Sequence, residues 1–145
     1  MENTEDFIIR VDRTVRRPNY ENIIHRDLEL TGPSEYDLRS LEKWFHRRQK
    51  KGEVSGNTIY DCLKKDNTLS NCLGFADLKA IQEKGITIFR KLFTWEIVYA
   101  WKGIMQGANG LQVPGLMGSG CEVLLILQSL DNDWNCDDPA LRFGK

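Results

Sequence analysis

The 145-residue chain lacks most of the residues and motifs that mark a catalytic or metal centre. It has only two histidines, and its four cysteines include no C-x-x-C pair, so a common metal-ligand spacing is missing. There is also no glycine-lysine-serine/threonine phosphate loop and no N-x-S/T glycosylation acceptor. We therefore expect no metal site and no cofactor.

Targeting and membrane signals are equally scarce. The N-terminus opens with acidic residues and has only three apolar residues in a row, Phe7 to Ile9, which are too few for a secretory signal. Twenty basic and 21 acidic residues nearly cancel, so net charge does not draw the chain to nucleic acid or to a membrane surface. We expect a cytoplasmic protein with reduced thiols, with the disulfides Cys62–Cys72 and Cys121–Cys136 as the alternative. We do not expect nucleic acid as a partner.

The sequence does contain enough apolar residues for one folded domain. Hydrophobic residues make up 41% of the chain and aromatic residues 10%, a composition that can bury a core of its own. We expect a mainly α fold, a small single-domain helical bundle of about five or six helices with a glycine-rich loop, over residues 1–130. Residues 131–145 are expected to form a polar, acidic C-terminal tail.

The stretch 33–52 carries the clearest helix signals. Ser34 follows a proline and stands three residues before Asp37, which is the spacing of a capping box, and Gly52 is a suitable stop. The apolar residues recur at helical spacing: Leu38, Leu41, Trp44 and Phe45. The last turn is crowded with cations, which the helix dipole favours there: Arg47, Arg48, Lys50 and Lys51.

Shorter signals predict further helices over 20–28, 59–63 and 78–84, each preceded by a capping residue. Residues 1–17 fit either an alternating strand or a helix, and we favour a helix. The longest apolar element, 87–105, is interrupted by four charged residues that are costly in hydrocarbon. It is therefore expected to be a core helix and not a membrane span. Its β-branched and aromatic content keeps a paired strand as an open alternative.

The C-terminal third begins with residues 103–120, which contain six glycines and one proline and are expected to form an apolar loop. Ser119 and Glu122 then have the spacing of a capping box, so we predict a final buried helix over 123–130.

The glycine loop and the tryptophans before it form the first candidate site. Free amides at a helix start bind anions and glycines allow close approach, although a plain packing loop explains the same residues. The candidate ligand-binding residues are Trp95, Trp101, Gly118, Ser119, Gly120 and Cys121.

Cysteine chemistry is the second possibility, because Cys121 is the cysteine best placed for a pKa lowered by a helix dipole. A catalytic cysteine also needs a base, and neither His25 nor His46 lies in a recognisable motif. The catalytic residues therefore stay unassigned. The third candidate is the basic patch of Arg47, Arg48, Lys50 and Lys51, which is either a solvated helix end or a surface for phosphates.

One family resemblance is carried by Pro33-Ser34, Asp37-Leu38, Leu41, Trp44-Phe45 and, after a spacer, Asp77-Leu78. This order, over about residues 28–92, resembles the middle of a large fungal family of uncharacterised, mostly helical, membrane-associated proteins. The resemblance implies a helical cytosolic part followed by C-terminal membrane spans. This chain has a glycine-rich stretch and an acidic tail in place of those spans, so we expect no transmembrane segment. No site residues follow from the family.

The sequence favours a non-enzymatic interaction or accessory protein with a protein partner, because no catalytic constellation, cofactor fingerprint or metal spacing is present. The alternative is a small enzyme or ligand-binding protein with an apolar, aromatic-lined pocket near the glycine-rich loop. Whether the chain is an enzyme remains open at this point.

Overall fold

The computed structural model describes residues 3–15 and 20–144, and it has a mixed α/β architecture. The α-helices are α1 (Arg26–Glu29), α2 (Gly56–Lys65), α3 (Phe75–Gln82) and α4 (Ile86–Leu92). The strands are β1 (Ile8–Arg10), β2 (Glu35–Asp37), β3 (Glu42–Trp44), β4 (Val54–Ser55), β5 (Val98–Tyr99), β6 (Met105–Gly107), β7 (Gly110–Ser119), β8 (Glu122–Ser129), β9 (Asp133–Trp134) and β10 (Ala140–Arg142). Short 3-10 helices connect them: η1 (Thr4–Phe7), η2 (Tyr20–Asn22), η3 (Leu38–Ser40), η4 (Leu69–Asn71) and η5 (Trp101–Gly103). The expectation of a mainly α helical bundle is therefore wrong.

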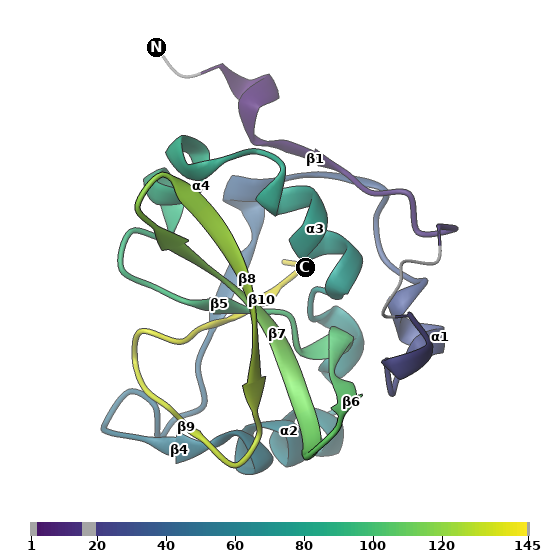
Figure 1. Cartoon of the computed structure of the whole chain (residues 1–145), viewed down its shortest axis with the longest axis vertical. Helices are drawn as coiled ribbons and strands as arrows, with labels where there is room; N and C mark the ends of the chain where they lie inside the picture. The colour runs from purple at the N-terminus through teal and green to yellow at the C-terminus, as the bar shows by residue number, and fades with distance from the viewer. Residues whose placement is uncertain (1–2, 16–19, 145) are drawn as a thin grey trace.

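Most of the strands join one mixed sheet of six strands, in which β7 is central (Figure 1). β8 runs along one edge of β7, and β5 and β6 both pair with its other edge. β10 pairs parallel to β5 and antiparallel to β3, which brings the end of the chain into the sheet. Two separate two-stranded pairs, β1–β2 and β4–β9, complete the strand pairing.

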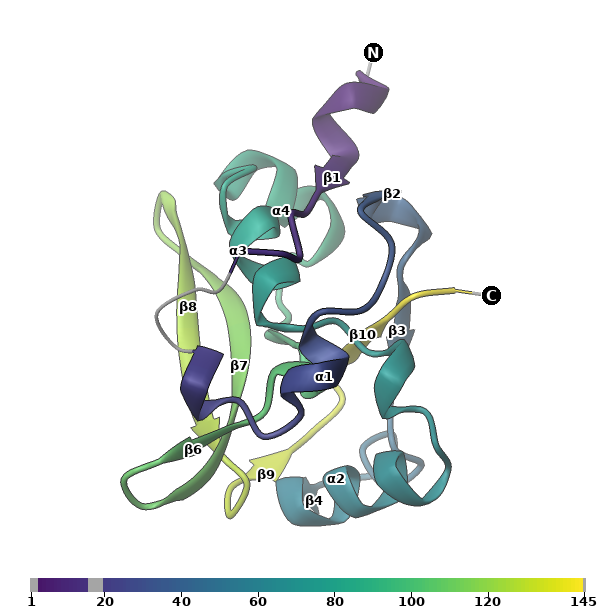
Figure 2. The same ribbon diagram turned by 90° about the vertical axis from the view of Figure 1, so that its right-hand side faces the viewer.

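Apolar side chains cover both faces of this sheet. Helices α3 and α4 pack against one face of β7 and β8, as Figures 1 and 2 show, and they bury Val98 and Leu116 there. The opposite face carries an aromatic cluster in which Trp101 and Trp134 lie 5.4 Å apart between ring centres. Helix α2 covers this second cluster. Each face therefore has its own core.

Residues 33–52 form β2, η3, β3 and turns instead of the predicted helix. The Asp37 carboxylate accepts a hydrogen bond from the Arg39 amide at 2.8 Å, so the capping signal marks one 3-10 turn. Beyond it, β3 pairs with β10, and Arg142 forms an ion pair at 2.7 Å with Glu42, which is 100 residues away. This long-range pairing outweighs the local helical pattern, because tertiary context routinely overrides intrinsic propensity.

The C-terminal half departs furthest from the expectations. Only the start of 87–105 is helical, as α4, and its later part contains β5 and η5, so the strand alternative holds there. The glycine-rich stretch forms β6 and β7, and the predicted final helix is β8. A β-carbon at Gly115 would lie 2.9 Å from the Tyr99 ring, which explains a glycine inside a strand. Gly120, with φ of 59°, makes the turn between β7 and β8.

Two of the predicted short helices are confirmed as α2 and α3. Ser55 caps α2 by accepting from the Thr58 amide at 3.3 Å, so this helix begins at Gly56, earlier than predicted. Asp77 lies within the first turn of α3, where its carboxylate accepts from the Gly74 amide at 2.8 Å. The predicted helix over 20–28 is represented only by η2 and the beginning of α1.

The two ends of the chain contribute strands. Within 1–17, β1 pairs with β2 and buries Ile9, so the strand alternative applies there, while residues 1–2 and 16–17 lie outside the described range. The stretch expected as a polar tail contains β9 and β10 and buries Trp134 and Leu141. No described helix has both the length and the apolar composition needed to cross a bilayer.

Candidate functional site

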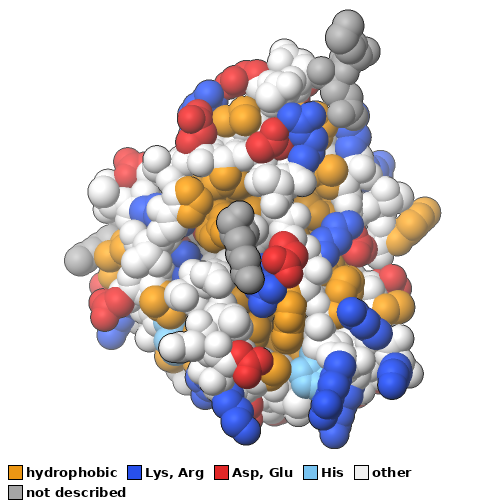
Figure 3. Space-filling view, turned by 180° about the vertical axis from the view of Figure 1, so that it is seen from behind, with side chains coloured by type: hydrophobic (Ala, Val, Ile, Leu, Met, Phe, Trp, Pro, Cys, Tyr) orange, Lys and Arg blue, Asp and Glu red, His pale blue; other side chains and the backbone are white. Residues whose placement is uncertain are grey.

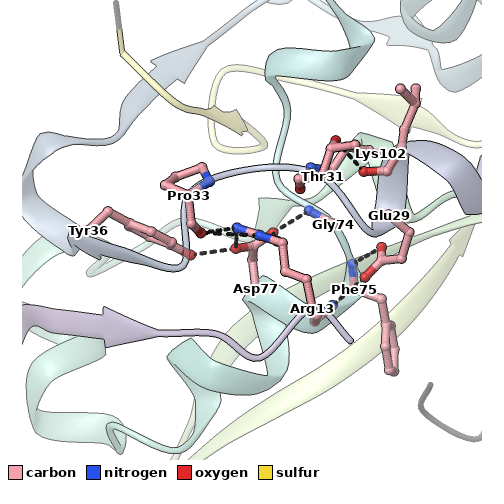
Figure 4. Close-up of polar contacts among 11 residues, drawn as sticks. Arg13, Glu29, Thr31, Pro33, Tyr36, Gly74, Phe75, Asp77 and Lys102 are labelled. Atoms are coloured by element: carbon pink, nitrogen blue, oxygen red, sulfur yellow. Dashed lines mark hydrogen bonds and ion pairs between the residues drawn. The ribbon is translucent and has the colours of Figure 1, made fainter. Parts of the chain in front are cut away.

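Buried charged groups gather where the N-terminal segment crosses the start of α3 (Figure 4). Asp77 is fully buried and accepts from the Arg13 guanidinium at 2.9 and 3.1 Å and from the Tyr36 hydroxyl at 2.7 Å. The Gly74 amide donates to the same carboxylate. Arg13 also donates to the carbonyl of Pro33 at 2.7 and 3.1 Å. The ion pair is thus surrounded by hydrogen bonds, as a buried charge requires.

Two more buried ionisable residues lie next to this pair. The Glu29 carboxylate accepts from the amides of Phe75 at 2.7 Å and Ala76 at 2.9 Å, at the start of α3, and burial raises the pKa of Glu29. Lys102 is fully buried and donates to the Thr31 carbonyl at 2.8 Å, and burial lowers the pKa of Lys102. Shifted pKa values of this kind often mark active sites.

The cluster nevertheless has no room for a substrate. The cavity beside it, lined in part by Arg13, Glu29 and Phe75, has a volume of about 10 Å³, which is near the minimum for one water molecule. Its polar atoms bind one another and the backbone of adjacent segments. The arrangement therefore acts as a clamp that fastens the N-terminal segment to α3.

The reactive side chains elsewhere are also dispersed. His25 Nε2 and the Tyr60 hydroxyl are 2.6 Å apart, and burial lowers the pKa of His25 and raises that of Tyr60. All four cysteines are free thiols, and burial raises the pKa of Cys72 to about 12. Cys121 is exposed at the turn between β7 and β8, so the helix-dipole argument for it is wrong. In the described part of the chain, no three His, Cys, Asp or Glu side chains gather as a metal site.

The four cations of the basic patch lie in turns between β3 and β4, and we call this segment the basic turn: Arg47, Arg48, Lys50 and Lys51. Its anchor is the buried Gln49, whose side-chain amide donates to the carbonyls of Asn135 and Asp138, both at 3.0 Å. All four cations are exposed, and within the described residues none of them forms an ion pair.

The basic turn borders a surface concavity of about 420 Å³, lined by Arg47, Arg48 and Lys51. Figure 3 views the molecule from the side opposite to Figure 1 and shows Lys and Arg side chains gathered beside a histidine at the lower right. The predicted helix end does not exist here, so a helix dipole does not explain the four cations. These four side chains are solvated and have no ion-pair partner among residues 3–15 and 20–144.

The largest exposed aromatic side chain is Trp95, which is 87% exposed on the turn between α4 and β5. Together with Ile97, Met117 and Gly118 it lines a concavity of about 520 Å³. Leu124 lies directly across from Met117 in the β7–β8 ladder, so its side chain shares this face. We call the four side chains Trp95, Ile97, Met117 and Leu124 the Trp95 surface.

Hydrogen bonds hold the backbone around Trp95 firmly. Thr94 Oγ1 donates to the Arg90 carbonyl at 2.7 Å, and the Ile97 amide donates to the Asp137 carbonyl at 3.0 Å. Lys43 Nζ donates to the Leu92 carbonyl at 2.9 Å and forms an ion pair with Glu96 at 2.5 Å. The indole is therefore presented by an ordered turn, with the nearest acidic side chain already paired.

The predicted ligand-binding residues do not meet in one place. Trp95 and Gly118 line the same concavity, and Ser119, Gly120 and Cys121 follow at the adjacent turn. Trp101 lies in the aromatic core, 1% exposed. The predicted ligand site therefore stays a prediction only for the residues at or next to this concavity, and Trp101 does not belong to it. Sequence reasoning missed Met117 and Leu124, which the strand-like alternation of β7 and β8 would have placed on one face.

Comparison of the chain with protein-family models, curated proteins and solved structures finds no match. The resemblance to the fungal family stays a prediction.

Proposed function

We propose that this protein is a non-enzymatic interaction protein that binds a protein partner through the Trp95 surface. The observation that carries the proposal is Trp95 itself, 87% exposed on a hydrogen-bonded turn. Tryptophan supplies a large apolar area at low entropic cost and is enriched among the residues that dominate binding energy.

The surroundings of Trp95 favour an apolar contact. Ile97, Met117 and Leu124 extend the exposed apolar area beyond the indole, and contiguous apolar patches on a protein surface commonly mark interaction sites. The charged side chains at the rim are already engaged, because Glu96 pairs with Lys43 and Arg90 donates to the Gly120 carbonyl at 2.5 Å. A partner that inserts an apolar side chain against Trp95 fits this arrangement best.

The test compares Trp95→Ala with Ile24→Ala, a control that removes another exposed apolar side chain (43% exposed). Both variants should keep the wild-type stability within about 0.5 kcal/mol, since they change surface positions. In quantitative pull-downs, proteins retained by the wild type and by Ile24→Ala should be lost from Trp95→Ala. A purified partner should then shift the tryptophan emission of the wild type to shorter wavelength and shield it from iodide.

The opposite result is equally clear. If Trp95→Ala retains the same proteins as the wild type, or if the bound partner leaves Trp95 as accessible to iodide as before, the Trp95 surface is not the binding site.

A further inference from the structure

Strand β8 forms an outer edge of the main sheet. It pairs with β7 alone among the described strands, and Figure 2 shows it at the left margin of the sheet with β7 on its inner side. In an antiparallel ladder, alternate residues direct their amide and carbonyl toward the partner strand. The Leu130 amide donates to the Leu111 carbonyl at 3.2 Å. It follows that the even-numbered residues of β8 face β7 and the odd-numbered residues face outward.

The contacts at the two ends of β8 agree with this alternation. The Gln82 side chain donates to the Val123 carbonyl at 2.9 Å, and the Asn132 amide donates to the Ser129 carbonyl at 3.1 Å. Both carbonyls belong to odd-numbered residues and point away from β7. The outward carbonyls at the strand ends are therefore already occupied.

The centre of the strand is different. The outward amides and carbonyls of Leu125 and Leu127 have no hydrogen-bond partner among residues 3–15 and 20–144. No charged residue and no proline occurs from 123 to 130, although proteins commonly use such residues to protect a sheet edge. Leu124 and Leu127, on opposite faces of the strand, are 37% and 41% exposed. We call this segment, Leu125 to Leu127, the free edge of β8.

We propose that two copies of this chain pair through the free edge of β8, antiparallel, about a two-fold axis at Ile126. In this register Leu125 of one copy lies opposite Leu127 of the other, and each both donates and accepts one hydrogen bond. Ile126 lies against Ile126 of the partner copy, a β-branched pair that suits a sheet. The two sheets then become one continuous sheet.

A second copy is the occupant that the free edge fits best. The free donors and acceptors, on residues two apart, are their own complement under a two-fold axis, as an isologous interface requires. The uncharged segment brings no like charges together when it meets itself. The inference rests on β8 and not on Trp95, so it stands or falls independently of the proposed function.

The decisive variant is Leu127→Pro, compared with Leu127→Ala. The Leu127 amide points away from β7, so proline removes an outward donor and leaves the β7–β8 ladder intact. Alanine removes the same side chain but keeps the donor. Sedimentation equilibrium from micromolar to millimolar concentration should show the wild type and Leu127→Ala rising from 16.8 kDa toward twice that mass. Leu127→Pro should dimerise at least about tenfold more weakly, because each dimer loses two hydrogen bonds.

Two results overturn the proposal: a wild type that stays monomeric over this range, including one that binds another protein's strand there, or a Leu127→Pro variant that dimerises as tightly as Leu127→Ala. If circular dichroism shows that Leu127→Pro does not fold, amide hydrogen exchange of the wild type decides. Exchange at Leu125 and Leu127 should slow as protein concentration rises, and concentration-independent rates contradict the strand pairing.

Discussion

The clamp at α3 and the basic turn are both rich in charged residues, but the charges are buried and paired in the clamp and exposed in the basic turn. In the clamp, Arg13 and Asp77 are buried together, and the Tyr36 hydroxyl and the Gly74 amide also donate to the Asp77 carboxylate. In the basic turn, Gln49 is the only buried residue, and the four cations around it have no ion-pair partner in the described chain. The buried ion pair joins the N-terminal segment to α3, whereas the cations of the basic turn face solvent.

The same comparison shows that shifted pKa values do not by themselves mark a functional site in this protein. The clamp contains the raised pKa of Glu29 and the lowered pKa of Lys102, yet it has space for about one water molecule. The basic turn is open to a concavity of about 420 Å³. Space for a ligand therefore distinguishes a possible binding surface from a structural cluster better than a shifted pKa does.

The largest expected effect is that of breaking the buried ion pair. Asp77→Asn leaves Arg13 buried without its counter-charge, so the free energy of unfolding should fall by about 3–5 kcal/mol. The matched control is Asp61→Asn, because Asp61 forms an exposed ion pair with Lys64 at 3.7 Å. That change should cost less than about 1 kcal/mol. Urea denaturation of both variants measures the difference, and similar losses would show that the clamp is not a stabilising centre.

An intermediate effect is expected from pH at Glu29. Its folded pKa is raised by burial, so the folded state holds the proton more tightly than the unfolded state. This contribution to stability is present below the ordinary carboxyl pKa and is lost as pH rises through the raised value. Each unit of pKa difference corresponds to about 1.4 kcal/mol.

The measurement is the unfolding free energy of the wild type minus that of Glu29→Gln, followed upward from about pH 4, near the ordinary carboxyl pKa. The difference should decline with rising pH and then level off. A difference that rises over this interval would mean that the Phe75 and Ala76 amides, and not burial, control the Glu29 carboxyl.

Local sequence signals predict helix α3, to which the clamp fastens the N-terminal segment. They do not predict the strand pairing of the main sheet. The existence of helix α3 was predictable, because a cap and a short apolar pattern are local. Asp77 was expected as the cap before residue 78, but the helix begins at Phe75 and Asp77 lies in its first turn. The pairing of β3 with β10 depends on residues 100 apart, such as Glu42 and Arg142, and no local spacing reports it. The Ser119–Glu122 spacing predicts a helix cap, but the two residues lie opposite each other across the β7–β8 hairpin, so that prediction is wrong.

The candidate surfaces were partly predictable for the same reason. Exposure of the four cations follows from their charge, but their position on a turn anchored by Gln49 depends on carbonyls from residues 135 and 138. Trp95 was identified as a candidate, whereas its exposure and the burial of Trp101 follow only from the order of strands in the sheet.

The smallest effect should come from the cations of the basic turn. A variant with Arg47, Arg48, Lys50 and Lys51 all changed to Gln alters only exposed, unpaired side chains, so each substitution should change stability by no more than about 0.5 kcal/mol. Gln49→Leu, at the centre of the same turn, takes away the partner of the Asp138 carbonyl and of the His46 amide, which donates to the Gln49 side-chain oxygen at 2.8 Å. This change should cost about 1–3 kcal/mol. Denaturation midpoints compare the two variants. Equal losses would mean that the four cations help to hold the turn, and the distinction between partnered and unpartnered charge in this molecule would fail.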